Sequence, residues 1–448
     1  MTTDRSGEGL AALASDLRTG ERGPMRYIGT VRDRIDARDG DIRAWVDDGK
    51  SRAWLTAEAD ALTERYPEPT GSSSDEPTRP PLFGVPVGVK DIFHIDGLPT
   101  RAGSSLPADA LAGPEATAVR RLRAAGALVA GKTHTTEFAY FAPGPTRNPH
   151  DLDHTPGGSS SGSAAAVANG TTPLALGTQT VGSVIRPAAF CGVVGFKPSY
   201  GRIPTDGVIP LSASVDHVGT FTRDVDGTAL AASVLIDDWA GVPGAADDDA
   251  ADTRPTLGVP VGPYRDQATE AGERAFRAAL DSLERAGYDL VCVEAFPDID
   301  EVNERHNDLV ASEAALAHGE WYDAYPDRYA DATAELIEEG RASPVSTLVR
   351  GRRGRSALRE SLAAIATQAG IDAWVAPAAP GPAPAGTDDT GDPVMNLPWT
   401  HAGLPTVGLP AGTVDDLPVG VQVATGFGHD ERLLAWASAL ADVVADAA

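Results

Sequence analysis

The sequence is poor in cysteine and in long apolar runs. Its 448 residues include two cysteines, Cys191 and Cys292, which excludes a disulfide scaffold and a cysteine-rich zinc site. No run of 18 apolar residues occurs, so no membrane span is expected. The first residues, MTTDRSGEGL, lack the apolar segment of a secretory signal. We therefore expect a cytoplasmic protein that does not associate with membranes.

Basic residues are also scarce. The chain has 37 Lys and Arg against 64 Asp and Glu, a net charge of −27, so the phosphate backbone of a nucleic acid would be repelled. Only four residues are lysine, namely Lys50, Lys90, Lys132 and Lys197. An acidic, lysine-poor surface is typical of a protein that works in concentrated salt, where ions screen the self-repulsion. We interpret the acidity as adaptation to the solvent, which makes each remaining lysine noteworthy.

The order of the apolar segments indicates an α/β fold. LFGVPVGVKDIF has the composition of a buried strand, ATAVRRLRAAG that of a helix, and ALVAGKT that of the next strand. This alternation predicts a large mixed, mostly parallel β-sheet covered by helices on both faces. No clear linker interrupts the chain, so we expect a single domain over 1–448. It would comprise an N-terminal helical region at about 1–65, a core at about 82–235 and a helix-rich insertion at about 300–370.

Three short motifs suggest functions that the surrounding sequence does not favour. HDLDH at 150–154 would place two histidines on one helix face, as in zinc peptidases, but Pro149 before it favours a loop. GSSSG at 158–162 matches the nucleophile motif of α/β-hydrolases with Ser160 as nucleophile, yet a Pro-rich loop precedes it instead of a strand. RGRRGR at 350–355 is read as a solvated helix end, with docking of RNA or a protein partner as the alternative.

Lys90 stands in an unusual context. It follows the apolar run GVPVGV, where a lysine is costly unless it is neutral or paired. The residues alone leave two interpretations open: an ion pair with Asp91, or a neutral amine that serves as a base. A serine hydroxyl is a weak nucleophile that needs such a base, and serines are abundant at 157–163 and present at Ser183.

The stretch from Gly84 to Pro204 resembles the amidase signature family, serine hydrolases that act on amides. The matching segments are GVPVGVKD (84–91), GKTHTTEFAY (131–140), TPGGSSSGSAAAVANG (155–170), LALGTQTVGSVIRPAAFCGVVGFKPSYGRI (174–203), NLPWTHAGLPTVGLPAG (396–412) and LPVGVQV (417–423). They occur in the family's order and spacing and cover most of the chain. The resemblance implies the amidase-signature fold.

The resemblance also implies roles for individual residues. Lys90 matches the catalytic lysine and Ser159 the bridging serine, which the family holds next to a cis peptide bond. Ser183, 24 residues after Ser159, matches the nucleophile. The oxyanion hole would be formed by the backbone N–H groups of Thr180, Val181, Gly182 and Ser183. Further candidates for contact with the substrate are Gly158, Ser160 and Arg186.

The chain departs from the common family pattern at three places. Gln179 stands where much of the family has an acid, and Val181 where it has Gly or Ala; a valine there is costly if the position needs positive φ. Arg186 comes one residue later than in the commoner order Ser-x-Arg-x-Pro. Two roles for Arg186 remain open: binding a substrate carboxylate, or pairing with a backbone carbonyl or an acid within the protein.

Together these observations predict an amidase. It would cleave the C–N bond of a small carboxamide through an acyl-enzyme on Ser183 and release a carboxylate with ammonia or an amine. Lys90 must be neutral to act as base, so burial has to lower its pKa from about 10.4. No metal or cofactor is required, and a homodimer remains open. The main alternative is the glutaminase (A) subunit of a Glu-tRNA/Asp-tRNA amidotransferase, which would need partner subunits; a non-catalytic scaffold would not need the intact Lys90, Ser159 and Ser183.

Overall fold

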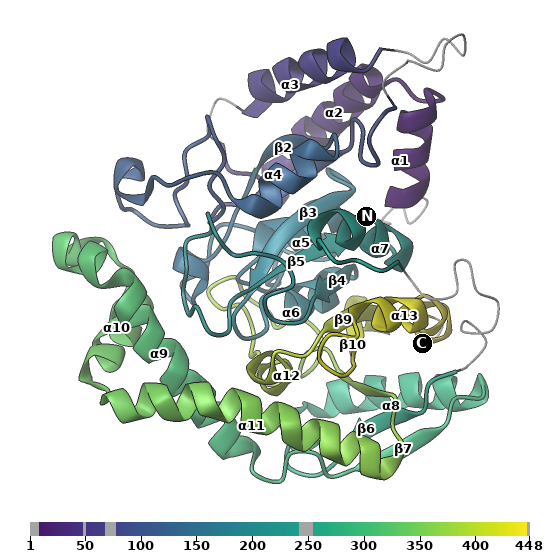
Figure 1. Ribbon diagram of the computed structural model, residues 1–448, viewed down its shortest axis with the longest axis vertical. Coiled ribbons are helices and arrows are strands. Elements are labelled where there is room, and N and C mark those ends of the chain that lie inside the picture. Colours follow the sequence, from purple (N-terminus) through teal and green to yellow (C-terminus); the bar gives the residue numbers. More distant parts are fainter. Residues whose placement is uncertain (1–8, 48–50, 68–77, 242–253, 446–448) are drawn as a thin grey trace.

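The computed structural model describes residues 9–47, 51–67, 78–241 and 254–445. In this part of the chain ten strands form one sheet in the order β2-β1-β3-β5-β4-β9-β10-β8-β6-β7 (Figure 1). The strands are β1 Pro86–Lys90, β2 Leu128–Thr133, β3 Leu174–Gln179, β4 Val194–Lys197, β5 His217–Thr222, β6 Leu257–Pro260, β7 Leu290–Val293, β8 Ala373–Pro377, β9 Thr406–Val414 and β10 Leu417–Ala424.

The described residues also form thirteen α-helices and four short 3₁₀ helices. The α-helices are α1 Leu10–Thr19, α2 Pro24–Ile42, α3 Ser51–Arg65, α4 Thr117–Ala124, α5 Ser161–Ala168, α6 Ile185–Cys191, α7 Val225–Leu235, α8 Glu270–Arg285, α9 Ile299–Ala324, α10 Asp331–Ala342, α11 Val345–Ala369, α12 Leu397–Ala402 and α13 Asp430–Ala445. The 3₁₀ helices are Ala108–Leu111, Glu137–Ala139, Arg265–Gln267 and Pro326–Arg328. Within the described ranges, none of the helices combines the length and apolar character needed to cross a bilayer.

Helices cover both faces of the sheet, as the sequence predicts. Because side chains alternate along a strand, neighbouring residues of β3 enter different cores. Leu174 and Leu176 pack in the large core shared with α1, α7, α8 and α13. Ala175 between them packs with residues of α5 and α6. The small residues therefore face α5 and α6, and the large aliphatic residues face the other layer.

The sheet is mixed, but the expectation that parallel pairs dominate it is wrong. Of the nine pairings between described strands, four are parallel and five antiparallel. The parallel pairs lie toward the two edges, and the centre from β3 to β8 is antiparallel. One cause is the hairpin between β9 and β10, whose two loop residues, Asp415 and Asp416, have φ of 50° and 66°. Two consecutive residues with positive φ form the tight hairpin turn that joins antiparallel strands.

Glycines on four neighbouring strands form the floor beneath α6. A Cβ on Gly195 of β4 would lie 2.7 Å from Cβ of Ala188, and one on Gly219 of β5 would lie 2.9 Å from Cγ2 of Val184. A Cβ on Gly408 of β9 or on Gly420 of β10 would also press against α6. The backbone of these four strands therefore contacts the helix directly, which explains why glycine occupies these positions.

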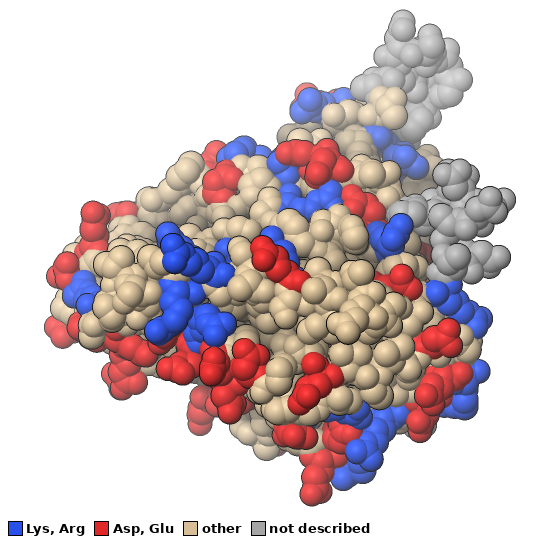
Figure 2. All heavy atoms as spheres, turned by 60° about the horizontal axis from the view of Figure 1, so that its bottom comes forward, with Lys and Arg blue, Asp and Glu red and all other residues tan. Residues whose placement is uncertain are grey.

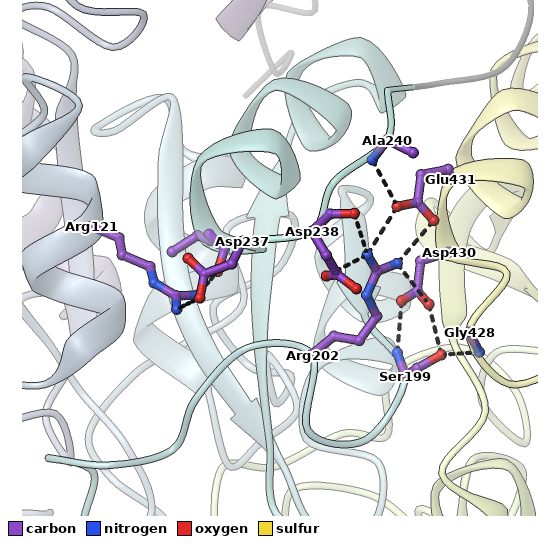
Figure 3. A network of polar contacts seen from close by, with 10 residues as sticks. Arg121, Ser199, Arg202, Asp237, Asp238, Ala240, Gly428, Asp430 and Glu431 are labelled. Atoms are coloured by element: carbon purple, nitrogen blue, oxygen red, sulfur yellow. Dashed lines mark hydrogen bonds and ion pairs between the residues drawn. The ribbon is translucent and has the colours of Figure 1, made fainter.

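The C-terminal helix is tied to the loop that follows β4 by a polar network (Figure 3). Arg202 donates to both carboxylate oxygens of Glu431 at 2.9 Å and to Asp238 at 2.9 Å. Ser199 donates its N–H and its hydroxyl to the two oxygens of Asp430, each at 2.7 Å. Because Asp430 and Glu431 begin α13, this network fixes where the last helix lies on the sheet.

Residues 300–370 hold the three helices α9, α10 and α11, which lie beside the sheet (Figure 1). Leu309 and Val310 of α9 pack against Leu211 and Val215, which belong to the loop before β5. The helices thus reach the core at the segment 211–216.

Candidate active site

Lys90 ends β1 and is completely buried. Its Nζ lies within hydrogen-bond distance of three hydroxyl oxygens: Ser159 Oγ at 2.7 Å, Thr178 Oγ1 at 2.8 Å and Ser160 Oγ at 3.0 Å. Ser159 and Ser160 lie in the loop before α5, and Thr178 lies on β3. The amine is therefore held by neutral groups, and one of them is the predicted bridging serine.

The charge environment favours the neutral form of Lys90. Burial lowers its pKa well below the ordinary value, and the negative charge of Asp216 opposes this only in part. Among the described residues no carboxylate lies within ion-pair distance of its Nζ. Asp91 pairs with Lys132 at 2.8 Å. The ion pair between Lys90 and Asp91 is thus not formed, and of the two interpretations the neutral amine fits the geometry.

Ser159 lies in a loop that is pressed against the start of α6. The peptide bond between Gly158 and Ser159 is cis, as the resemblance implies. Arg186 donates from Nη2 to the carbonyl oxygen of Gly158 at 2.8 Å. A Cβ on Gly157 would lie 2.8 Å from Cα of Pro187, so only glycine fits there. These contacts fix the loop next to the segment that carries Ser183.

Ser183 precedes α6 and is 7% exposed, more than Lys90, Ser159 or Ser160, which lie between 0% and 2%. Its hydroxyl makes no hydrogen bond with any described residue. The structure therefore brings Lys90 and Ser159 into direct contact, whereas the hydroxyl of Ser183 is hydrogen-bonded to neither of them. Ser160 is wholly buried, and its Oγ also donates to the carbonyl of Thr178 at 3.1 Å.

Gln179 holds the loop 180–183 in shape. Its Oε1 accepts from the N–H groups of Val184 and Ile185 at 2.8 and 2.9 Å. Its Nε2 donates to the hydroxyl of Thr400 at 2.8 Å, which in turn donates to the carbonyl of Val181 at 2.7 Å. Gln179 thus satisfies N–H groups at the start of α6 and links this loop to α12.

Positions 181 and 182 of this loop differ in the side chains that they can accommodate. Val181 is not among the residues with positive φ, so its branched side chain carries no backbone penalty. It packs beside the core that contains Trp399 and Met395. Gly182, by contrast, is required, because a Cβ there would lie 2.5 Å from Oδ1 of Asn396.

A small pocket opens next to Thr178, one of the three partners of Lys90. Two of its lining residues, Thr178 and Thr180, belong to or follow β3, and one wall is formed by the segment 208–211. Among the described residues that line it, only Asp216 is ionisable.

The sequence did not point to Thr178 or Asp216, since they become neighbours of Lys90 only through strand pairing. The single hint was the alternation of LALGTQT, which places Thr178 and Thr180 on one side of the strand.

Of the three short motifs, HDLDH lies in a loop, GSSSG at the turn that enters α5, and RGRRGR within α11. Residues 150–154 are not helical, and Nε2 of His150 bonds the carbonyl oxygen of Cys191 at 2.9 Å. In the described chain no strand leads directly into the turn at Ser160, so the strand–turn–helix of an α/β-hydrolase is not formed. Residues 350–355 lie inside α11 and not at a helix end. Arg350 pairs with Asp308 at 2.8 Å and Arg352 with Glu313 at 2.7 Å. Figure 2 shows basic side chains gathered among acidic ones on one face of the molecule.

Comparison with known proteins identifies the family. The family model named Amidase matches residues 33–434. The chain belongs to the Amidase family. AtzE of Pseudomonas sp. (strain ADP), which forms part of 1-carboxybiuret hydrolase, is 34% identical over 87% of this chain and 88% of its own length. The A-subunit of glutamyl-tRNA(Gln) amidotransferase from Salinispora arenicola (strain CNS-205) is 32% identical over 99% and 98%. A crystal structure of an amidase superposes with a TM-score of 0.82 at 34% identity, over 98% of this chain and all of that one.

Membership of the Amidase family confirms the resemblance seen in the sequence and the α/β fold. The chain is accordingly an amidase, a hydrolase of amide C–N bonds.

We expect Gln179→Glu to lower kcat about 10-fold with little change in KM. A carboxylate can still accept from the two N–H groups at the start of α6, but it cannot donate to Thr400, so the carbonyl of Val181 loses its partner or the loop shifts. Steady-state kinetics with a primary amide measures the effect. Thr400→Val, which removes the same link from the other side, should act alike, and Thr400→Ser should not. Wild-type kcat in both Gln179→Glu and Thr400→Val would show that the link does not position the loop.

Proposed function

We propose that this amidase hydrolyses a small carboxamide through an acyl-enzyme on Ser183, with Lys90 as the base and Ser159 as the proton relay. The observation that carries the proposal is the buried Lys90, whose amine bonds Ser159 at 2.7 Å without an acidic partner among the described residues. A neutral amine next to a hydroxyl is the arrangement that general-base activation of a serine requires.

The proposed reaction begins with two proton transfers. Lys90 accepts the proton of Ser159 while Ser159 accepts that of Ser183, and Oγ of Ser183 forms a bond to the amide carbon. The carbonyl oxygen becomes an oxyanion, which the N–H groups of residues 180–183 stabilise. The proton then returns from Lys90 through Ser159 to the leaving nitrogen, and the C–N bond breaks. Water attacks the resulting ester with Lys90 again as base, which releases the carboxylate and restores Ser183.

No step of this reaction needs a metal or cofactor. We infer that the chain acts in the cytoplasm on a small-molecule amide, as one domain over 1–448 and without nucleic acid or membrane partners. Residues 1–8, 48–50, 68–77, 242–253 and 446–448 of that domain lie outside the described part. The net charge of −27 supports function in concentrated salt.

Substrate contacts are proposed for Gly158, Ser160 and Arg186, and Arg186 is the most informative of them. It is 2% exposed, and burial lowers the pKa of its guanidinium to about 10. Nη2 bonds Gly158, whereas Nε and Nη1 have no hydrogen-bond partner in the described structure. An unsatisfied buried guanidinium indicates a ligand or ordered water that completes it. We propose that a carboxylate of the substrate does so.

We therefore expect a carboxylate-bearing primary amide to be hydrolysed with a kcat/KM about 10- to 100-fold above that of its neutral isostere, as a charged hydrogen bond is worth about 1.5–3 kcal/mol. Ammonia release from a panel of aliphatic, aromatic and acidic amides measures this ratio at high and low salt. In Arg186→Met the ratio should fall to about one. Arg186→Met also loses the hydrogen bond to Gly158, but this loss affects both substrates and therefore cancels in the ratio. An unchanged ratio would leave Arg186 with its structural role alone.

The similarity to a component of an amidotransferase favours a second candidate, a glutaminase that supplies ammonia to partner subunits. Glutamine in the same panel separates the two functions. A free-standing amidase hydrolyses other amides by itself, whereas an amidotransferase component hydrolyses glutamine and does so fully only with its partners. Gln179 and the order Ser183-Val-Ile-Arg186-Pro187 are the features that favour the free-standing enzyme.

A further inference from the structure

Asp216 is an acidic residue next to the site that the proposed reaction does not use. It immediately precedes β5 and lines the pocket beside Thr178 and Thr180. Its Oδ1 accepts the hydroxyl of Thr180 at 2.6 Å. Thr180 is the first of the four residues proposed to stabilise the oxyanion. A carboxylate thus contacts the side chain of a residue whose backbone N–H is proposed to act in the reaction.

The second carboxylate oxygen of Asp216 forms hydrogen bonds within the loop 211–216 to which Asp216 belongs. Oδ2 accepts from the N–H groups of Leu211 and Ser212 at 2.9 and 3.0 Å. Asp216 therefore bridges two segments: the loop 211–216 on one side and the proposed oxyanion loop on the other. With three protein donors it is largely satisfied, which fits a role in positioning better than a role in binding a substrate cation.

The loop 211–216 is itself anchored from outside by Glu313 of α9. Oε2 of Glu313 accepts from the hydroxyl of Ser212 at 2.7 Å and the N–H of Ser214 at 2.8 Å. Its Oε1 accepts the hydroxyl of Ser214 at 2.5 Å and pairs with Arg352 of α11. Glu313 itself is 3% exposed, so its carboxylate is shielded from solvent. The loop that carries Asp216 is therefore fixed to α9 by several hydrogen bonds.

The environment of Asp216 also separates it from an ordinary surface acid. Its packed surroundings raise its pKa to about 6, while the donors from Thr180, Leu211 and Ser212 oppose the shift. A carboxylate kept in such a place needs compensating hydrogen bonds. Of these three donors, Thr180 is the one that belongs to the proposed oxyanion loop.

We propose that Asp216 is a positioning residue, which fixes the proposed oxyanion loop through its hydrogen bond to the hydroxyl of Thr180. The inference rests on the proposed function, because it assigns a support to the oxyanion hole of Ser183. An oxyanion donor acts in the transition state and not in substrate binding, so disturbing its position lowers kcat and leaves KM nearly unchanged.

The test is a double-mutant cycle between Thr180→Val and Asp216→Ala. Valine has the shape of threonine without the hydroxyl, so Thr180→Val removes one bond and leaves the two backbone bonds of Asp216 intact. We expect each variant to lower kcat roughly 10- to 100-fold with KM within about 2-fold of the wild type. The double variant should be no slower than the slower single variant, because both break the same link. Thr180→Ser keeps the hydroxyl and should recover most of the kcat that Thr180→Val loses.

Several outcomes would overturn the proposal. A wild-type kcat in Thr180→Val, a change confined to KM, or multiplying effects in the double variant would each show that Asp216 does not act through Thr180. Should Asp216→Ala fail to fold, Thr180→Val and Thr180→Ser still decide the matter. Ser183→Ala, measured in the same series, keeps the two hypotheses apart. If it retains turnover, the proposed function itself fails; if it is inactive while Thr180→Val is normal, only the positioning role fails.

Discussion

Ser183→Ala is expected to lower kcat for amide hydrolysis by about 10⁴- to 10⁶-fold while the protein unfolds at the wild-type temperature. The variant removes the only group that forms the acyl-enzyme in the proposed reaction. Stability should not suffer, because the hydroxyl of Ser183 has no hydrogen-bond partner in the described structure, and its loss leaves no buried group unsatisfied. Ammonia release and labelling by a fluorophosphonate measure the two consequences; the wild type should be labelled at residue 183 and the variant not at all.

Ser160→Ala is the matched control for that experiment. It lies in the same serine-rich site, but its hydroxyl bonds Lys90, the carbonyl of Thr178 and the N–H of Thr178. Its removal should therefore cost stability and still permit labelling of Ser183. The opposite pattern, in which Ser160→Ala abolishes labelling and Ser183→Ala does not, would replace the proposed nucleophile with the one that the α/β-hydrolase motif suggests.

Lys90→Met is expected to lower kcat about 10²- to 10⁴-fold, the usual contribution of general acid–base catalysis. Methionine fills a similar volume but cannot accept a proton. In the wild type the rate should rise with pH as Lys90 loses its proton, at a pH below the ordinary lysine range because burial lowers its pKa. The variant should lack this rise. Pre-steady-state acylation over a range of pH measures both effects, and a wild-type pH profile in Lys90→Met would exclude Lys90 as the base.

The same group should make stability depend on pH. Because the pKa of Lys90 is lower in the folded protein than its ordinary value of 10.5, there is a pH window in which the unfolded chain holds a proton that the folded chain lacks. In that window the free energy of unfolding rises with pH. Denaturant unfolding between neutral pH and about pH 10 should therefore show the wild type gaining stability relative to Lys90→Met. A constant difference would mean that Lys90 keeps its proton on folding.

Lys132→Met provides a contrast, since Lys132 is an equally buried lysine in the next strand. It pairs with Asp91 at 2.8 Å, so its removal leaves a buried carboxylate unpaired. Such losses cost roughly 3–5 kcal/mol. The folded fraction of this variant should retain its kcat. Two neighbouring lysines would then have opposite signatures, one catalytic and one structural.

The sequence predicted the parts of the site that follow from local pattern. The apolar run before Lys90 indicated a buried lysine, and the glycine-rich stretch 174–203 indicated close backbone packing; both are found. The partner of Lys90 was not decided, because Asp91 is its neighbour in sequence while Thr178 is its neighbour in space. A residue next in a strand points to the other face, so Asp91 could not share the surroundings of Lys90.

Long-range pairing explains the remaining errors. The antiparallel centre of the sheet depends on a hairpin whose loop is Asp415-Asp416, and this pair lacks the glycine that usually signals such a turn. Asp216 meets Thr180 only because β5 pairs with β3, and Glu313 reaches the loop 211–216 from about a hundred residues away. No local pattern records such contacts.

The glycine floor under α6 limits how this enzyme can change. A side chain added at Gly195 or Gly219 would press against Ala188 or Val184 and so displace α6, which Ser183 precedes. Mutations that alter which amides are accepted should therefore accumulate in the walls of the pocket, such as 208–216, and not beneath α6. Related hydrolases would then differ in the residues that line the pocket and keep glycine at the positions beneath α6.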